Sequence, residues 1–174
     1  LNASVEIFET PISRTTQSSG PLAGVPMFLK DILATIEGVT QECGSRLLKG
    51  AVSETTSHFS RRILDAGLQV IGRSTCPEFG LTLTTESIAE GITRNPWNLN
   101  KITGGSSGGS AAVVAAGVVP VAHTNDGGGS TRVPASACGN LGLKTSRGLV
   151  SLGPRLNDVL APLVSEGCNS RTVR

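Results

Sequence analysis

Two segments rich in glycine and serine carry the residue types that acyl transfer needs. Residues 104–110 read Gly-Gly-Ser-Ser-Gly-Gly-Ser, and residues 125–132 read Asn-Asp-Gly-Gly-Gly-Ser-Thr-Arg. Glycine has no Cβ, so a substrate or a second backbone can approach such loops closely. A serine hydroxyl beside several backbone N–H groups combines a nucleophile with donors for an oxyanion. The two loops therefore indicate one shared catalytic site.

Glycine and serine are also typical of flexible linkers. Here, however, the first loop runs into a helix-forming segment, residues 110–116, which Gly117 ends. The second loop follows the β-branched, apolar run 118–122. Loops held between regular elements in this way favour a site over a linker.

Histidine is poorly placed to activate either serine. The first loop matches Gly-x-Ser-x-Gly in the frames centred on Ser106 and Ser107, the pattern of a hydrolase nucleophile elbow. That elbow needs an acid and then a histidine further along, and no histidine follows Asp126. We expect His123 to be a structural residue at a strand end and His58 to lie on the surface. A phosphate-binding loop is disfavoured as well, since neither loop is followed by the lysine of that motif.

Lysine is the remaining candidate base. Lys30 follows the apolar run 25–29, at the end of a predicted buried strand. An amine is a base only when neutral, so its ordinary pKa of ~10.4 must fall through desolvation or a nearby positive charge. The pattern leaves two roles open for Lys30: a base for serine, or a strand-end residue paired with Asp31.

The composition sets wide limits on function. The chain has 174 residues, a net charge of +2, 22 glycines, no tyrosine and only 3% aromatic residues. No basic patch with interleaved aromatic residues is present, so we expect no nucleic-acid partner. The longest apolar run is too short to span a bilayer, so no membrane partner is expected. Four scattered cysteines without a Cys-x-x-Cys spacing predict no metal site and favour a reducing cytoplasm.

Helical and strand patterns alternate along the chain, which predicts an α/β sheet with covered faces. Residues 1–20 form a polar lead-in, interpreted as a partial helix and then a Ser/Thr-rich loop. Strands are predicted at 24–29, 68–71, 118–122 and 149–152. Helices are predicted at 57–66, from 75–78, at 110–116 and from Thr131 onward, with a turn at 95–98 and a loop at 142–148.

Five segments together closely resemble the amidase signature family. They are Gly-Val-Pro-Met-Phe-Leu-Lys-Asp at 24–31, the loop at 104–110, Asp-Gly-Gly-Gly-Ser-Thr-Arg at 126–132, Pro-Ala-Ser at 134–136 and Gly-Leu-Lys-Thr-Ser-Arg-Gly at 142–148. The resemblance runs from about residue 20 to the end. It implies a mixed central sheet covered by helices, with residues 21–174 forming part of one catalytic domain. Members of the family commonly exceed twice this length, so we expect an N-terminal fragment.

The resemblance also implies an amidase that forms an acyl-serine intermediate with a Ser–cis-Ser–Lys triad and needs no cofactor or metal. Lys30 is then the base. Ser106, joined by a cis peptide, is the relay, and Ser130 is the nucleophile. The oxyanion hole would consist of four consecutive backbone N–H groups, those of Gly127, Gly128, Gly129 and Ser130. The expected partner is a small-molecule amide.

The chain departs from the family pattern at two positions. Thr145 replaces the usual proline and Asn125 a more usual threonine; we expect neither to touch the triad. The segments 93–97 and 121–126 are similar to the branch with aminohexanoate cyclic-dimer hydrolases. The glutamyl-tRNA amidotransferase branch is less favoured, because Val133 stands where that branch has glutamine. The alternative hypothesis is a non-catalytic remnant, or a fragment that only binds.

Overall fold

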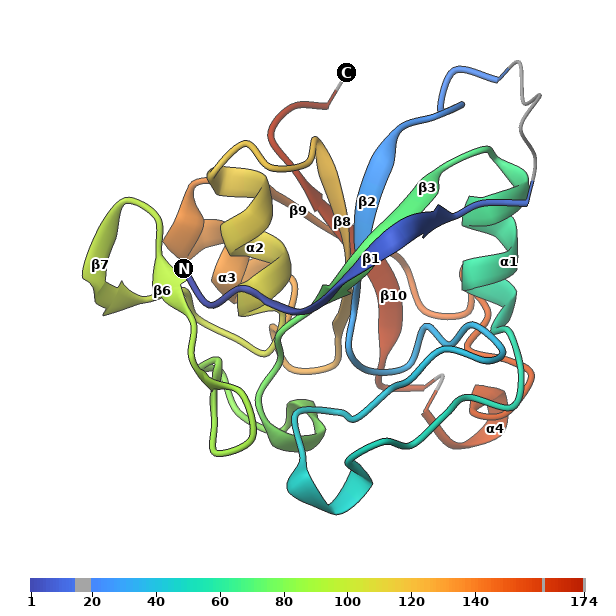
Figure 1. The fold of residues 1–174 in the computed structure, drawn as a ribbon, viewed down its shortest axis with the longest axis horizontal. Helices are drawn as coiled ribbons and strands as arrows, with labels where there is room; N and C mark the ends of the chain where they lie inside the picture. The colour runs from blue at the N-terminus through green and yellow to red at the C-terminus, as the bar shows by residue number, and fades with distance from the viewer. Residues whose placement is uncertain (15–19, 161, 174) are drawn as a thin grey trace.

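A six-stranded mixed sheet forms the centre of the computed structural model, which describes residues 1–14, 20–160 and 162–173 (Figure 1). The strand order is β1-β3-β2-β8-β10-β9. These strands are β1 Ser4–Ile12, β2 Pro26–Lys30, β3 Gln69–Ser74, β8 Val121–Asp126, β9 Leu141–Lys144 and β10 Ser165–Ser170. β2 runs parallel to β3 and β8, whereas the β1–β3, β8–β10 and β9–β10 pairs are antiparallel. The predicted mixed sheet is confirmed.

Helices cover the two faces of the sheet. Successive side chains of β2 point to opposite faces and therefore pack against different helices. Phe28 packs in a buried cluster with residues of α2 (Gly108–Ala115), such as Val114. Met27 and Leu29 belong to a second cluster, which includes Leu64 of α1 (His58–Asp65). Figure 1 shows α1 and α2 on either side of the strands. Two further helices are α3 (Arg132–Cys138) and the short α4 (Asn157–Leu160).

Smaller elements connect the main ones. Two hairpins consist of β4 (Glu86–Ser87) with β5 (Gly91–Ile92) and of β6 (Arg94–Asn95) with β7 (Asn98–Ile102). Two 3₁₀ turns are η1 (Arg46–Leu48) and η2 (Glu78–Gly80). The predicted turn at 95–98 is the tip of the β6–β7 hairpin. Its Trp97 indole donates to the Cys138 carbonyl over 2.7 Å, which holds the hairpin against the end of α3.

Local sequence signals placed three helices well. The Ser57 hydroxyl accepts a hydrogen bond from the Ser60 N–H over 3.2 Å and so caps α1. Gly67 and Gly117 follow α1 and α2 with φ of 91° and 76°, a conformation that glycine adopts easily. α3 begins directly after Thr131, as predicted.

Other predictions are wrong in part. Within residues 1–20, the expected partial helix is the strand β1, whose Ile7 pairs with Gly72 of β3. Pairing along a neighbouring strand overrides a weak helical pattern here. Residues 15–19 of the expected Ser/Thr-rich loop lie outside the described residues. The helix predicted to start at 75–78 is only the three-residue turn η2.

The C-terminal part differs most from the prediction. The segment 142–148, predicted as a loop, begins inside β9. Where a strand was predicted, residue 149 ends a turn, residue 150 is a bend, and residues 151–152 have no regular secondary structure. Leu149 is exposed there, so its apolar side chain signals no buried strand. The strand β10 was not predicted, although it lies between β8 and β9 and contacts both.

Candidate active site

Lys30 is the last residue of β2 and is fully buried, with an exposed fraction of 0%. Its Nζ donates to Ser106 Oγ over 2.6 Å and to Asn125 Oδ1 over 2.7 Å. The parallel strands β2 and β8 end side by side, which brings Lys30 next to Asn125. The amine is therefore held between the two glycine–serine loops.

Burial lowers the pKa of Lys30 to about 8, against the weaker opposing effect of nearby acidic groups. A lysine with this pKa is partly neutral in mildly alkaline solution and can accept a proton. The alternative role, pairing with Asp31, is wrong. The Asp31 carboxylate binds the Arg73 guanidinium and accepts the Glu42 N–H over 3.1 Å instead.

The first loop reaches Lys30 through Ser106. The peptide bond between Gly105 and Ser106 is cis, as the family resemblance implies. Ser107 is the N-cap residue of α2, and its N–H donates to the Ser130 carbonyl over 3.2 Å. This backbone hydrogen bond joins the first loop to the second.

Asp126, at the end of β8, organises the second loop. Its buried carboxylate accepts hydrogen bonds from the backbone N–H of Gly129 at 2.8 Å and of Thr131 at 3.1 Å. The side chains of Arg132 and Lys144 add contacts at 2.9 and 3.0 Å. Burial alone would raise the pKa of Asp126, but these hydrogen bonds outweigh it and hold the pKa well below its usual range. The carboxylate thus shapes the loop as an anion.

The four expected oxyanion donors do not have equivalent surroundings. Gly127 and Gly128 are exposed and line the same pocket as Ser130. The N–H of Gly129 instead points to the Asp126 carboxylate. The structure therefore leaves Gly127, Gly128 and Ser130 as candidates and gives Gly129 a structural hydrogen bond.

A pocket of about 640 Å³ opens over these groups. Ser106, Asn125 and Ser130 contribute polar side chains to its lining. Its walls are mainly apolar and come from three separate segments, which contribute Ile32 and Leu33, Phe79 to Leu83, and Leu160 with Leu163 and Val164. The site can hold an uncharged group against the two serines.

His58 lies on the surface, as predicted, whereas His123 lies in the middle of β8 and not at a strand end, because β8 extends to Asp126. His58 is exposed, and its Nδ1 is 2.8 Å from Ser151 Oγ. His123 is a buried residue of β8, with one ring nitrogen bonded to the Lys30 N–H and the other to Glu166. Neither contacts Ser106 or Ser107 among the described residues, so the structure does not support a nucleophile elbow.

Sequence reasoning missed the contact between Asn125 and Lys30. The expectation that position 125 does not touch the triad is wrong, because Asn125 accepts a hydrogen bond from Nζ and donates one to the Ile32 carbonyl at 3.1 Å. Its place directly before the Asp126 motif was the available signal. The other departure from the family pattern, Thr145, donates to the Glu166 carbonyl over 2.9 Å.

The described part of the chain offers neither a metal centre nor a membrane span. No group of three or more His, Cys, Asp or Glu side chains could hold a metal ion there. No described helix has the length and apolar character needed to cross a membrane. The four cysteines, Cys43, Cys76, Cys138 and Cys168, are free.

Comparison with known proteins identifies the sequence family of this chain and several similar proteins. The sequence model of the family described as Amidase matches residues 8–174. The chain is 43% identical over 174 residues to 6-aminohexanoate-cyclic-dimer hydrolase of Paenarthrobacter ureafaciens, covering 98% of this chain and 35% of that protein. It is 48% identical over 132 residues to a glutamyl-tRNA(Gln) amidotransferase subunit of Methanosarcina acetivorans, covering 76% and 28%.

Solved structures agree with these relatives. A structure of 6-aminohexanoate cyclic dimer hydrolase superposes with a TM-score of 0.84 at 44% identity, covering 89% of this chain and 33% of the other. The corresponding amidotransferase subunit of Thermotoga maritima superposes with a TM-score of 0.85 at 37% identity, covering 99% and 37%. The chain spans about a third of the length of the proteins it matches.

Proposed function

Because this chain belongs to the amidase family, we propose that its protein hydrolyses a carboxylic amide through an acyl-Ser130 intermediate. The observation that carries the proposal is the contact between Lys30 and Ser106: a buried amine with a pKa of about 8 lies 2.6 Å from a serine hydroxyl. That hydroxyl and Ser130 line one pocket. The family resemblance assigns the roles of Lys30, Ser106 and Ser130, and the sequence pattern by itself offered Lys30 as a candidate base.

The proton path runs from Ser130 to Lys30. Neutral Lys30 accepts the proton of the Ser106 hydroxyl, while Ser106 accepts the proton of Ser130. The Ser130 oxygen attacks the amide carbon and forms a tetrahedral oxyanion. The C–N bond then breaks, and the departing amine takes the proton back through Ser106. Water releases the acyl group by the same route, so amide and water give carboxylic acid and amine.

Backbone donors of the second loop stabilise the oxyanion in this scheme. Gly127 and Gly128 have no side chains and face the pocket, so a substrate carbonyl can approach their N–H groups. Removing one such donor typically costs about 100- to 1,000-fold in rate. Asp126 fixes the loop that contains these glycines through its hydrogen bonds to the Gly129 and Thr131 N–H groups.

The apolar pocket walls favour a substrate with an uncharged aliphatic or aromatic acyl group. The name of one relative, 6-aminohexanoate-cyclic-dimer hydrolase, denotes a substrate built of aliphatic aminohexanoate units, which supports an aliphatic acyl group. The four free cysteines support the predicted cytoplasmic location.

Covalent labelling tests the proposal. A serine-directed fluorophosphonate should add to Ser130, and mass mapping of the adduct should find it on that residue. Ser130→Ala should abolish both labelling and amide hydrolysis. Ser107→Ala is the matched control, since Ser107 lies in the neighbouring loop outside the pocket lining, and should keep both. An adduct on Ser106 or Ser107 would contradict the assignment.

A further inference from the structure

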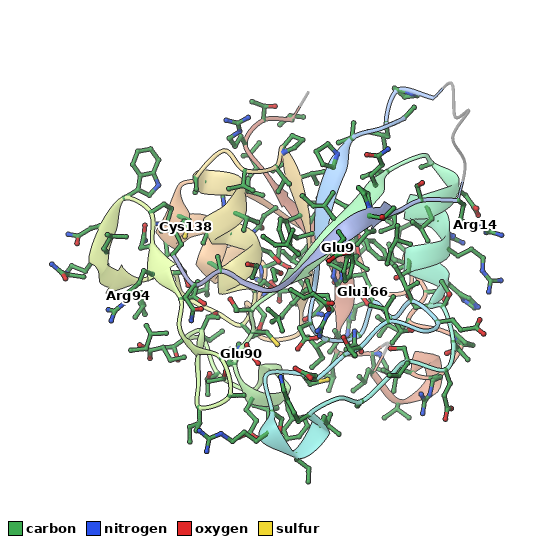
Figure 2. All side chains as sticks on the ribbon, in the orientation of Figure 1. Glu9, Arg14, Glu90, Arg94, Cys138 and Glu166 are labelled. Atoms are coloured by element: carbon green, nitrogen blue, oxygen red, sulfur yellow. The ribbon has the colours of Figure 1, made fainter. Side chains whose placement is uncertain are left out.

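A buried histidine and a buried glutamate lie next to Lys30. β2, β8 and β10 are neighbours in the sheet and contribute Lys30, His123 and Glu166, respectively. Both side chains are buried, with an exposed fraction of 0% for His123 and 2% for Glu166. Glu166 is labelled in Figure 2. A buried carboxylate destabilises a fold unless hydrogen bonds or opposite charge compensate it. The site proposed above does not use this pair.

The hydrogen bonds fix the proton of the histidine. The Lys30 backbone N–H donates to His123 Nδ1 over 3.2 Å. A backbone amide can only donate, so Nδ1 carries no proton and the ring proton lies on Nε2. Nε2 is 2.8 Å from Glu166 Oε2 and donates to it. The ring is thus neutral, anchored at both nitrogens, and packed against Phe59 at a centroid distance of 4.8 Å.

Glu166 is the acidic group near Lys30 whose charge has no cationic partner of its own among the described residues. The other acidic groups that act on Lys30 are Cys76, Asp126 and Cys43. Burial raises the pKa of Cys43 to about 12 and that of Cys76 further, so both thiols are uncharged at pH 8. The Asp126 carboxylate is already bound by two cationic side chains. The adjacent Asp31 is paired with Arg73.

We infer that His123 and Glu166 are positioning residues for Lys30. The His123 ring holds the backbone where β2 ends, and the Glu166 carboxylate, fixed by that ring, stabilises the ammonium that forms when Lys30 accepts the proton. This inference rests on the proposed role of Lys30 as the base. It assigns a function to two side chains that lie on different strands and do not line the pocket.

The pH dependence of kcat/KM tests the inference. In Glu166→Gln the negative charge is lost, so the apparent pKa of the acidic limb should fall by about one pH unit from its wild-type value. Glu42→Gln is the matched control. Glu42 is also buried, at 4% exposed, and its carboxylate accepts the Gly50 N–H over 2.8 Å. An apparent pKa that is the same in all three proteins would overturn the inference.

A double variant keeps the test decisive if Glu166→Gln folds poorly. His123→Leu alone leaves the Glu166 carboxylate buried without its donor and should lower Tm. Combining it with Glu166→Leu removes the unpaired carboxylate and should recover part of the lost Tm, since only the Lys30 backbone N–H then lacks its partner. The double variant should still show the lowered apparent pKa. An unchanged value would again reject the positioning role.

The charge of Lys30 can also be followed without turnover, by comparing each protein with its Lys30→Met derivative. The folded pKa of Lys30 lies below its unfolded value of ~10.4, so the free energy of unfolding should rise, relative to the Met derivative, between these two pKa values. The rise should begin near pH 8 in the wild type and at lower pH in Glu166→Gln.

This second readout separates the two proposals. If the onset is shifted in Glu166→Gln but Lys30→Ala keeps the wild-type activity, the base role is rejected and the positioning role of His123 and Glu166 is supported. If the onset is the same in Glu166→Gln and the wild type but Lys30→Ala is inactive, the positioning role is rejected and the base role is supported.

Discussion

The two glycine–serine loops have similar sequences but are held in place by different forces. The first, residues 104–110, is buried along its whole length and contains no charged residue. Its glycines are in close contact with other backbone segments: a Cβ on Gly109 would lie 2.5 Å from the Thr75 nitrogen and 2.6 Å from the Ala3 oxygen. Close packing therefore positions this loop.

The second loop, residues 125–132, is positioned by charge. The Asp126 carboxylate collects backbone N–H groups and two cationic side chains, while Gly127 and Gly128 stay exposed. A Cβ on Gly128 would meet no atom within 4 Å. The comparison teaches that glycine serves two purposes in one site: in the first loop it allows packing, and in the second it leaves N–H groups open to a substrate.

The largest expected effect comes from Lys30, which contacts both loops. Lys30→Ala should lower kcat by about a thousandfold or more, because base and relay act as one unit. The wild-type rate should rise with pH through about 8, where the ammonium loses its proton. Steady-state kinetics across pH measures both effects.

Lys49→Ala is the control for this variant, since the Lys49 side chain is 73% exposed, pairs with Glu42 and contacts neither loop in the described part of the chain. If Lys30→Ala keeps more than about a tenth of the wild-type rate, catalysis by the serines of the two loops does not depend on this amine.

The next largest effect concerns the first loop, residues 104–110, which is positioned by close packing. Gly109 lies inside α2, where alanine is favoured over glycine by about 1 kcal/mol on helix propensity alone. Its close backbone neighbours reverse that sign, and Gly109→Ala should lower the free energy of unfolding by about 3 kcal/mol. Chemical denaturation measures the change. A stabilised variant would mean that packing does not hold the first loop.

The second loop, residues 125–132, should respond to loss of the negative charge of Asp126. Asp126→Asn should lower the free energy of unfolding by about 2 kcal/mol at neutral pH. Loss of a fully buried ion pair would cost more, but the Arg132 side chain is 55% exposed. The folded pKa of Asp126 is depressed, so its stabilisation is present above the unfolded pKa of ~3.9 and is lost as pH falls further. The wild type and the variant should therefore converge in stability below pH ~4. Parallel curves down to pH ~2 would contradict the role of Asp126.

Sequence reasoning located the loops of the candidate site better than the sheet around them. The loops, Lys30 and the helices α1 to α3 were predicted because glycine, capping and apolar spacing are local signals. β10 was missed because its sequence, Ser-Glu-Gly-Cys-Asn-Ser, is polar. Its burial is stabilised by a partner far along the chain, His123 for Glu166, and no local pattern reports such pairing.

The environment of each site residue was harder to predict than its identity. Lys30 was found, but its hydrogen bond to Asn125 depends on two parallel strands that end together. The N–H of Gly129 was grouped with three similar donors, and only the fold of the loop around Asp126 sets it apart. Spacing in a sequence identifies chemical groups, whereas their partners depend on tertiary structure.

The smallest expected effect is that of Gly128→Ala, the counterpart in the second loop of Gly109→Ala in the first. The φ of Gly128 is not in the positive range, and no neighbour would contact the new Cβ. The substitution removes conformational freedom from the unfolded chain, so it should change the free energy of unfolding by at most about 1 kcal/mol, in the stabilising direction. The N–H of residue 128 remains, so loss of activity should be confined to bulky acyl groups, which would show as a raised KM with kcat unchanged. A destabilisation as large as that of Gly109→Ala would show that both loops are held by packing, and the contrast between them would fail.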